Sequence, residues 1–360
     1  MDFWTVRGNP DEVVAGLRSW LFEGDTSTRA LVVETSGSTG VPKRVLLTRE
    51  ALLASVHASA ARLGATGPWV LAVPPTFVAG VQVVARSLVA GHDPVLLGEA
   101  GWPEGSGWFV SLVPTQLTRM LDTPDDLSAL RRAHTVLLGG GPIGPALRAR
   151  AAAAGVHVVA TYGSAETAGG CVYDGLPLDG VAIALGEGGR IRIAGPTLFT
   201  RYVDQPDLTR ETLVDGWFLT SDAGRIDEDG RLVVIGRIDD VIVSGGLNVP
   251  GPAVAERLLA HPSVAEAEVL GVPDPEWGNR VVAFLSLVEE VAQRPSRSLV
   301  EEVAQRPSRD LQTTLRDWVA ETHPRAWAPR QFVVLDEIPL LPNGKPDRQG
   351  LLSLVEEVAP

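Results

Sequence analysis

Residues 35–43 read Thr-Ser-Gly-Ser-Thr-Gly-Val-Pro-Lys and combine four hydroxyls, two glycines and one lysine. Glycines let the backbone curl so that successive N–H groups point at one centre, and such a concavity binds anions. The hydroxyls add hydrogen-bond donors, and Lys43 adds a positive charge. This composition predicts a loop that binds phosphate oxygens, and the alternative is a flexible Ser/Gly turn.

The stretch differs from the P-loop of nucleoside triphosphatases, in which Gly-Lys is followed directly by Ser or Thr. Here Val41 and Pro42 separate Gly40 from Lys43, and no hydroxyl follows the lysine directly. The apolar, β-branched run at 30–33 predicts a buried strand that leads into the loop.

The choice of basic residues singles out two positions. The chain has 31 basic residues, and only Lys43 and Lys345 are lysines. Genome base composition explains a general preference for arginine. However, arginine cannot replace lysine where the site needs a compact point charge against a single oxygen, because the arginine guanidinium is planar and wide. Both lysines therefore stand out as candidate functional residues, although an exposed turn such as Pro-Asn-Gly-Lys at 342–345 would ordinarily carry a solvated lysine.

Further polar or glycine-rich stretches follow apolar runs later in the chain. After the run at 156–160, Tyr162 offers a flat ring for a base and Glu166 an oxygen ligand for a Mg²⁺ ion that carries phosphate. Asp222 and Arg237 also follow short runs, and a carboxylate there could hold a ribose. Each signal alone is compatible with an ordinary turn.

Composition limits the class of protein. The chain has 360 residues, 45% of them hydrophobic, which is enough for two domains with a sizeable core. No apolar run is long enough to span a membrane, so we expect a soluble cytoplasmic protein without a membrane partner. The net charge of −13 argues against a nucleic-acid partner. The single cysteine, Cys171, excludes an internal disulfide framework.

The apolar pattern predicts an α/β fold. Strands alternate with helical segments up to about residue 180, which is typical of βαβ units and a largely parallel sheet. Helices are expected at 10–22, 48–63 and 78–88, with Asn9 and Thr48 capping the first two. Strands are expected at 70–73, 94–97, 108–113, 135–138 and 156–160. Ligands bind beyond the C-terminal ends of parallel strands, so the loops that follow, such as 161–167, are candidate binding positions. Short strands at 190–194, 216–220 and 232–235 then predict a small β-rich subdomain. We expect a large N-terminal domain at 1–237, a hinge near Asp239 and a smaller, mobile α+β C-terminal domain at 238–360.

One sequence repeat stands apart from these motifs. Residues 286–297 and 298–309 are the same twelve residues in tandem, and the first seven of them recur at 353–359. Two copies are too few for a solenoid. We interpret the repeat as a duplication that lengthens a surface connection.

The order of the motifs resembles the adenylate-forming superfamily, which comprises acyl-CoA synthetases, adenylation domains of peptide synthetases and luciferases. The resemblance covers roughly residues 30–350. Residues 111–117 and 169–178 look like the short, actinobacterial-type 2-succinylbenzoate–CoA ligases of menaquinone biosynthesis. The resemblance implies that ATP, with Mg²⁺, activates 2-succinylbenzoate as an acyl-adenylate, which is then transferred to coenzyme A.

The resemblance also implies roles for individual residues. Lys345 would be catalytic, Glu166 would bind the metal, and Asp239 would be the hinge. The remaining candidates are Ser36, Gly37, Ser38, Thr39, Gly40 and Lys43 for the ATP phosphates; Gly139, Gly140, Gly141, Tyr162, Gly163 and Ser164 for adenine and AMP; Asp222 and Arg237 for the ribose; Arg86, Thr115 and Gly170 for the acyl substrate; and Ser244, Gly245 and Gly246 for coenzyme A.

Arg86 is a candidate because it is a lone charge on an apolar helix, where it could meet the second carboxylate of the substrate. The alternative is an arginine whose head group reaches the surface. The sequence departs from the superfamily at Ala165, where a threonine hydroxyl usually contacts the α-phosphate, so that Ser164 or Thr167 would have to substitute. It also has Thr76-Phe77 where the ligases often have histidine, which leaves details of the acyl pocket open.

Three alternatives remain open at this stage. The enzyme could act on another aryl or acyl acid, or it could be a stand-alone adenylation domain that loads a carrier protein. It could also be a nucleotide-binding protein with a decayed site, although both lysines are retained. The sequence leaves open whether the chain acts as a monomer or as a homodimer.

Overall fold

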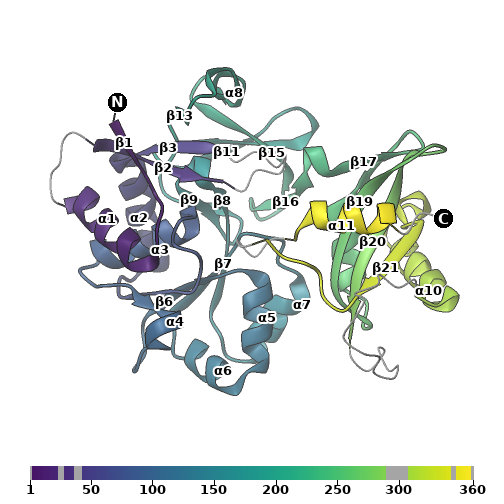
Figure 1. Ribbon diagram of the computed structural model, residues 1–360, viewed down its shortest axis with the longest axis horizontal. Helices are drawn as coiled ribbons and strands as arrows, with labels where there is room; N and C mark the ends of the chain where they lie inside the picture. Colours follow the sequence, from purple (N-terminus) through teal and green to yellow (C-terminus); the bar gives the residue numbers. More distant parts are fainter. Residues whose placement is uncertain (1, 23–27, 36–42, 289–306, 342–345, 358–360) are drawn as a thin grey trace. The chain divides into compact units, whose positions relative to one another are not determined.

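The computed structural model describes residues 2–22, 28–35, 43–288, 307–341 and 346–357 (Figure 1). The chain divides into two compact units. The first comprises Met1–Thr220 and Arg225–Val233, and the second comprises Ser221–Gly224 and Val234–Pro360. The division passes through two paired strands, β15 (Trp217–Ile226) and β16 (Leu232–Arg237).

The predicted first helix is confirmed as α1 (Pro10–Phe22). Asn9 and Glu12 cap its start reciprocally: Asn9 Oδ1 accepts from the Glu12 N–H at 3.0 Å, and Glu12 Oε2 accepts from the Asn9 N–H at 2.9 Å. Such paired capping satisfies donors that the first helical turn leaves unpaired. Proline in the first turn costs no hydrogen bond.

A four-stranded sheet carries the ends of the Ser/Gly loop. Its order is β1-β2-β3-β13, with β1 at Asp2–Thr5, β2 at Thr28–Glu34, β3 at Arg44–Thr48 and β13 at Arg201–Tyr202. Strand β3 was not predicted. The predicted cap at Thr48 is confirmed, because its side chain accepts from the Ala51 N–H at 3.1 Å and α2 (Arg49–Leu63) begins there.

The second sheet has seven strands in the order β10-β9-β8-β7-β6-β4-β5. Its five strands from β8 to β5 are parallel, so the largely parallel sheet is confirmed. Strand β9 pairs antiparallel with β8, and β10 pairs antiparallel with β9. The bounds are β4 Trp69–Leu71, β5 Val95–Leu96, β6 Phe109–Leu112, β7 Thr135–Leu138, β8 Val158–Ser164, β9 Gly169–Tyr173 and β10 Leu176–Pro177.

Helices cover both faces of this sheet, because its strands are apolar on both sides. Trp69 and Leu71 of β4 pack into the core cluster that contains α2 and α3 (Val78–Val89). Val70 faces the opposite cluster, which contains α5 (Pro114–Asp122), α6 (Pro124–Leu130) and α7 (Pro145–Ala153). Figure 1 shows these two helix groups on separate sides of β6 and β7. A short α4 (Leu97–Ala100) takes up the end of the strand predicted at 94–97.

The expected β-rich part is a third sheet, β11-β12-β15-β14, with β16 beside β15. Its remaining elements are β11 Ala182–Leu185, β12 Arg190–Ala194, β14 Leu213–Val214 and the preceding helix α8 Pro206–Thr212. Strand β15 is twice as long as the strand predicted at 216–220. Asp222 therefore lies within the strand and not at its end, because pairing with β16 extends β15.

The second unit is an α+β unit, as expected. Its sheet has the order β18-β17-β20-β19, and β21 pairs in parallel with β20. The elements are β17 Val241–Ser244, β18 Leu247–Pro250, α9 Gly251–Leu259, β19 Val264–Asp274, β20 Gly278–Leu287, α10 Arg309–Ala320, β21 Gln331–Leu335 and α11 Arg348–Glu357.

The repeated sequence takes two different secondary structures. Ser286 and Leu287, which open the first twelve-residue copy, end strand β20. The same pair recurs as Ser353-Leu354 inside helix α11. Residues 289–306 lie outside the described residues, so the predicted surface connection is not tested.

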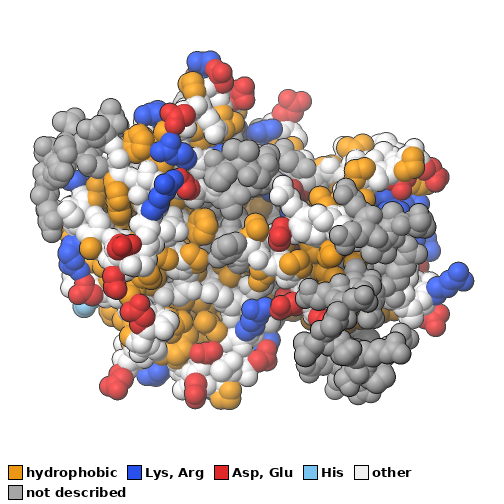
Figure 2. Space-filling view, in the orientation of Figure 1, with side chains coloured by type: hydrophobic (Ala, Val, Ile, Leu, Met, Phe, Trp, Pro, Cys, Tyr) orange, Lys and Arg blue, Asp and Glu red, His pale blue; other side chains and the backbone are white. Residues whose placement is uncertain are grey.

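The surface carries both signs of charge. On the face shown in Figure 2, acidic and basic side chains are interspersed over the described residues. In the described part of the chain, no helix is both long and apolar enough to cross a membrane.

Candidate active site

The Ser/Gly loop is anchored at both ends by a strand pair. Strands β2 and β3 are antiparallel with Glu34 opposite Arg44, and the Thr35 N–H donates to the Lys43 carbonyl at 2.8 Å. The loop is thus closed at its base by the sheet. Ser36, Gly37, Ser38, Thr39 and Gly40 lie outside the described residues.

Lys43 and Glu166 are connected through a third residue, Tyr202. Glu166 lies in the short 3₁₀ helix η1 (Ala165–Thr167) and is 8% exposed. The Tyr202 hydroxyl donates to Glu166 Oε1 at 2.8 Å, and Lys43 Nζ lies 5.5 Å from the centroid of the Tyr202 ring. Two of the predicted phosphate-site residues, which are over 120 positions apart in the sequence, therefore flank one aromatic side chain.

Tyr202 is held as a neutral donor. Burial, reinforced by the negative charge of Glu166, raises the pKa of the Tyr202 phenol well above its usual value. The phenol is therefore protonated at neutral pH and donates a hydrogen bond to the carboxylate.

The residues around Glu166 suit a magnesium ion that arrives with phosphate. Among the described residues, no three His, Cys, Asp or Glu side chains form a metal-binding cluster. Mg²⁺ commonly takes one or two carboxylates and completes its coordination with phosphate oxygens and water. A buried carboxylate without an ion pair in the described part of the chain, as Glu166 is, fits this role.

The hairpin β8–β9 shows which hydroxyl could compensate for Ala165. The Thr167 hydroxyl accepts from the Ser164 N–H at 2.9 Å and lies 2.7 Å from the Gly169 carbonyl, to which it can donate. The Thr167 hydroxyl is therefore already occupied by hydrogen bonds to the backbone of the turn. In contrast, Ser164 Oγ is buried and has no hydrogen-bond partner among the described residues. A buried hydroxyl without a partner is costly, so Ser164 is the better candidate to contact a ligand.

Tyr162, Gly163 and Ser164 lie on β8 itself, which corrects the expectation of a loop at 161–167. The strand continues because β9 folds back and pairs with it antiparallel, with Tyr162 opposite Val172. The hairpin is tight, since a Cβ atom on Gly163 would lie 2.2 Å from the Gly169 carbonyl oxygen. The last strand residues and η1 thus form one rigid support for Glu166.

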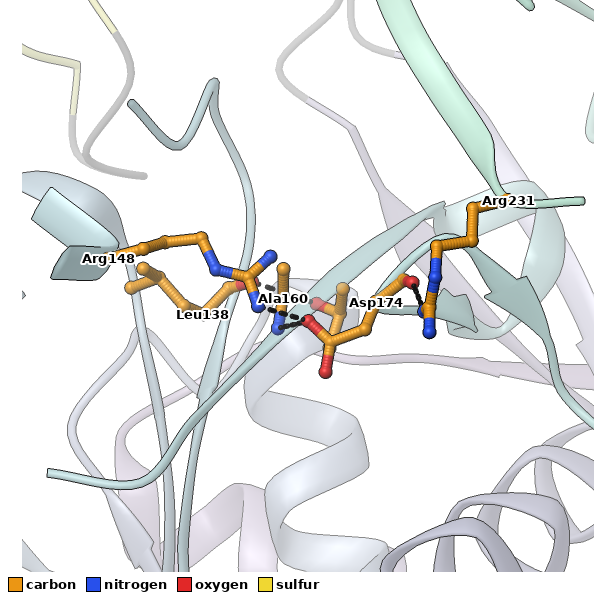
Figure 3. A network of polar contacts seen from close by, with 6 residues as sticks. Leu138, Arg148, Ala160, Asp174 and Arg231 are labelled. Atoms are coloured by element: carbon orange, nitrogen blue, oxygen red, sulfur yellow. Dashed lines mark hydrogen bonds and ion pairs between the residues drawn. The ribbon is translucent and has the colours of Figure 1, made fainter. Parts of the chain in front are cut away.

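Asp174 fastens the other end of this hairpin (Figure 3). Its Oδ1 accepts from the Ala160 N–H at 3.1 Å and from Arg148 at 2.7 Å, and its carbonyl accepts from Arg231 Nη1 at 2.6 Å. Asp174 has a φ of +46°, a left-handed conformation that aspartate tolerates in turns. The strand that carries Tyr162 and Ser164 is therefore fixed at its start as well as at its end.

The three glycines at 139–141 follow the end of β7. A Cβ atom on Gly139 would lie 2.4 Å from Thr161 Oγ1, and Gly140 has a φ of +82°. Both positions thus disfavour a side chain. Gly141 has no such close neighbour. The contacts of all three glycines with adenine remain predictions.

Arg86 is buried in the first unit. Its Nη2 donates to Ser59 Oγ at 3.1 Å and to the Tyr173 hydroxyl at 3.2 Å, and its guanidinium lies 4.9 Å from the Trp69 ring centroid. Burial lowers its pKa. The alternative of a head group at the surface is wrong, because only 6% of the residue is exposed. In the described part of the chain, no carboxylate forms an ion pair with it.

The two other acyl candidates lie on elements of the seven-stranded sheet. Thr115 is the second residue of α5, which begins directly after β6. Gly170 is on β9, where a Cβ atom would lie 3.1 Å from the Cβ atom of Thr161. Their contact with an acyl group remains a prediction.

Asp222 and Arg237 belong to the paired strands β15 and β16. Arg237 Nε lies 3.9 Å from Asp240 Oδ1. Asp239 lies in the 3₁₀ helix η3 (Ile238–Asp240), which directly follows β16. The ribose and hinge roles remain predictions.

The predicted coenzyme A loop is a tight hairpin turn between β17 and β18. Gly245 and Gly246 have φ values of +58° and +78°, as a two-residue turn with both central residues left-handed requires. A Cβ atom on Gly245 would lie 2.7 Å from the Trp277 ring. Ser244 is buried at the end of β17. The turn needs glycine for its own geometry, whatever ligand it meets.

The turn that carries the second lysine is also closed at its base. Leu340 and Pro346 form an antiparallel bridge, and the Asp347 N–H donates to the Pro339 carbonyl at 2.8 Å. Lys345 itself lies outside the described residues.

Arg348, just after this turn, links it to the segment around Asp239. Its Nε donates to Glu268 at 2.7 Å and its Nη1 to Asp240 at 2.6 Å. Burial raises the pKa of Glu268, although the charge of Arg348 opposes this. The pKa of Arg348 is raised because the two carboxylates outweigh the effect of its burial.

Tyr202 and Arg348 are the two residues that the sequence motifs did not single out. The available signal for Tyr202 was that it is one of only three tyrosines. For Arg348 it was the position three residues after Lys345.

The first unit thus brings Lys43, at the base of the Ser/Gly loop, and the buried carboxylate of Glu166 to the same tyrosine, as a site for a metal-bound nucleotide would require. Residues 23–203 match the family model of AMP-binding enzymes, and residues 253–345 match that of the AMP-binding enzyme C-terminal domain. The chain belongs to the AMP-binding enzyme family.

Within this family, the chain is similar to several proteins named as ligases or synthetases. The chain is 41% identical to a probable 2-succinylbenzoate–CoA ligase of Mycobacterium tuberculosis, over 90% of this chain and 84% of that protein. It is 30% identical to the 2-succinylbenzoate–CoA ligase of Listeria monocytogenes, over 98% of this chain and 74% of that protein. An o-succinylbenzoate CoA synthetase from Bacillus subtilis, in complex with the acyl-adenylate intermediate OSB-AMP, matches with a TM-score of 0.71 at 28% identity, over 89% of this chain and 68% of that one.

Proposed function

We propose that this chain is an AMP-forming acid–thiol ligase that activates 2-succinylbenzoate and transfers it to coenzyme A in menaquinone biosynthesis. The observation that carries the proposal is the 41% identity to a probable 2-succinylbenzoate–CoA ligase over most of both chains. ATP, coenzyme A and Mg²⁺ are the co-substrates and cofactor. The related Bacillus subtilis enzyme has been solved with ATP and magnesium ion.

In the first half-reaction, a carboxylate oxygen of the acid attacks the α-phosphorus of ATP. A phosphorus–oxygen bond forms to give the acyl-adenylate, and the bond to the leaving pyrophosphate breaks. Such a transfer depends on positioning and on neutralising charge. Lys43 and the 36–40 loop would bind the β- and γ-phosphates, Ser164 Oγ the α-phosphate, and Lys345 the oxygens where charge develops. A magnesium ion held by Glu166 would supply further charge neutralisation.

In the second half-reaction, the sulfur of coenzyme A attacks the acyl carbon, and AMP leaves with the electron pair of the broken carbon–oxygen bond. We propose that the unit bearing Lys345 rotates about Asp239 between the two steps and then presents the Ser244–Gly246 turn. The residues on either side of such a hinge absorb a change in φ and ψ.

Arg86 is proposed to compensate the second carboxylate of the substrate. A buried guanidinium that meets only hydroxyls and an aromatic ring keeps an uncompensated charge. A desolvated carboxylate nearby would lower that cost. Thr115 and Gly170 are proposed to line the same acyl site. We further propose that the enzyme acts in the cytoplasm without a nucleic-acid partner.

The test is a panel of aryl and acyl acids assayed for pyrophosphate and AMP release, with and without coenzyme A. Release that is largest with 2-succinylbenzoate and saturates with free coenzyme A supports the proposal. Pyrophosphate release without any saturation by coenzyme A would instead indicate a domain that loads a carrier protein. A Ser164→Ala variant should lose at least about tenfold in adenylation if its hydroxyl replaces the missing threonine.

A further inference from the structure

Tyr202 lies between Glu166 and Lys43, the two charged groups proposed to bind the metal ion and the phosphates of the nucleotide. Tyr202 is only 2% exposed, and its hydroxyl donates a hydrogen bond to Glu166 Oε1 at 2.8 Å. Its ring lies 5.5 Å from Lys43 Nζ. One side chain thus contacts the proposed metal ligand through its hydroxyl and the proposed phosphate ligand through its ring.

The fold fixes Tyr202 in this position from several directions. Strand β13 pairs with β3, which places Tyr202 opposite Val45, two residues after Lys43. The Tyr202 N–H donates to Thr209 Oγ1 at 3.0 Å, and its ring packs against Phe199 with centroids 4.8 Å apart. The Phe199 N–H in turn donates to the Glu166 carbonyl at 2.9 Å. The segment 199–202 therefore fixes both the backbone and the side chain of Glu166.

The hydrogen bond restricts how Glu166 can use its two oxygens. A carboxylate free to rotate can bind a metal ion through either oxygen or through both. With Oε1 accepting the hydrogen bond of the Tyr202 hydroxyl, the carboxylate is held in one orientation. A group that orients a ligating carboxylate in this way typically changes metal affinity by a factor of ten or more when removed.

We propose that Tyr202 is a positioning residue that orients Glu166 toward the magnesium ion of the bound nucleotide and couples this carboxylate to the phosphate loop at Lys43. This inference rests on the proposed function for the role of Glu166. The tyrosine does not take part in the chemistry itself. Its hydroxyl sets the orientation of the metal ligand, and its ring supports the lysine ammonium by a cation–π interaction.

The test uses the full-length protein and Mn²⁺ with the non-hydrolysable analogue α,β-methylene-ATP. Free Mn²⁺ is measured by electron paramagnetic resonance in titrations of wild type and of Tyr202→Phe. The phenylalanine keeps the ring near Lys43 and removes the hydrogen bond to Glu166. We expect the apparent dissociation constant for Mn²⁺ in the ternary complex to rise about tenfold. Metal-free binding of the nucleotide analogue should change less than twofold.

Tyr173→Phe is the matched control. It also removes a buried tyrosine hydroxyl, but that hydroxyl contacts Ser59 and Arg86 rather than Glu166. Its Mn²⁺ affinity should equal that of wild type. In steady-state assays, the Mg²⁺ concentration for half-maximal pyrophosphate release should rise for Tyr202→Phe alone.

The outcomes separate this inference from the proposed function. If Tyr202→Phe and Tyr173→Phe bind Mn²⁺ as wild type does, the positioning role is refuted, while acid activation is untouched. If Tyr202→Phe binds Mn²⁺ more weakly than wild type and wild type activates no acid in the panel, the proposed function fails and the role of Tyr202 stands. Equal weakening in both variants would indicate general loss of packing and would also refute the positioning role.

Discussion

Arg348→Met should destabilise the second unit, because it removes the cation between two largely buried carboxylates. The side chains of Glu268 and Asp240 are only 13% and 16% exposed. Arg348 donates to them at 2.7 and 2.6 Å. Methionine keeps much of the apolar stem, so that the change mainly concerns charge and hydrogen bonding.

The magnitude follows from these contacts. A hydrogen bond to a charged group contributes about 1.5–3 kcal/mol, and an unpaired buried charge costs more. Arg348 is 36% exposed, so solvent screens part of this effect. We therefore expect a loss of about 2–3 kcal/mol in the free energy of unfolding. For a unit of this size, that corresponds to a fall of about 6–15 °C in the unfolding midpoint.

The loss should depend on pH. Burial already raises the pKa of Glu268, and removing the positive charge of Arg348 raises it further. A carboxyl whose folded pKa exceeds its unfolded pKa destabilises the fold as pH rises through that window. The deficit of Arg348→Met should therefore be larger at pH 7.5 than at pH 5, because lowering the pH toward the raised pKa of Glu268 favours its neutral form.

Differential scanning calorimetry of the full chain at both pH values measures this effect. Glu268→Gln in the same background should restore part of the lost stability. Arg325→Met is the control, because Arg325 forms an exposed ion pair with Asp317 at 3.1 Å and its removal should cost less than about 0.5 kcal/mol. Equal deficits in the two arginine variants, or a deficit that does not change with pH, would refute the reasoning.

Four further predictions follow from the site. Lys345→Ala should lower acyl-adenylate formation by about two to three powers of ten while thioester formation from pre-made acyl-adenylate changes little, and equal loss in both half-reactions would show a structural role. Arg86→Met should raise KM for 2-succinylbenzoate at least about tenfold and leave KM for ATP nearly unchanged; an unchanged KM for the acid would remove Arg86 from the acyl site. Asp239→Pro should preserve the fold but uncouple the half-reactions, because proline fixes φ near −65°, and normal rates for both would mean that the pivot lies elsewhere. Burial raises the pKa of the Cys171 thiol to about 12, so iodoacetamide should not modify the folded protein at pH 8 but should modify it in urea, and rapid labelling of the folded chain would contradict this.

Local signals in the sequence were sufficient for the first helices and the parallel core. Asn9-Pro10 and Thr48 mark helix starts through side-chain chemistry that acts within a few residues. Continuous apolar runs such as Thr135–Leu138 identify strands that are buried on both faces. These features do not depend on distant parts of the chain, which is why the sequence predicts them.

The features that the sequence did not predict depend on contacts between segments that are distant in the chain. Tyr162–Ser164 looks like a loop because it is polar and contains glycine, but β9 provides antiparallel hydrogen bonds. Asp222 lies inside β15 for a similar reason. The contact of Tyr202 with Glu166 joins residues 36 positions apart, and no spacing rule reports it. The order of the motifs indicated the family, but not the hydrogen bond from Tyr202 to Glu166.

The tandem repeat has a consequence for how this gene can change. Its first copy begins with the last two residues of β20, and its second copy ends with Ser308 and Arg309, where Ser308 caps α10. Since the copies are identical, deletion or gain of one twelve-residue copy leaves the same residues at the end of the strand and at the start of the helix. In general, doubling the number of residues in a loop costs only about 0.6 kcal/mol in loop-closure entropy. The number of copies between β20 and α10 can therefore change without altering the residues that end the strand or cap the helix.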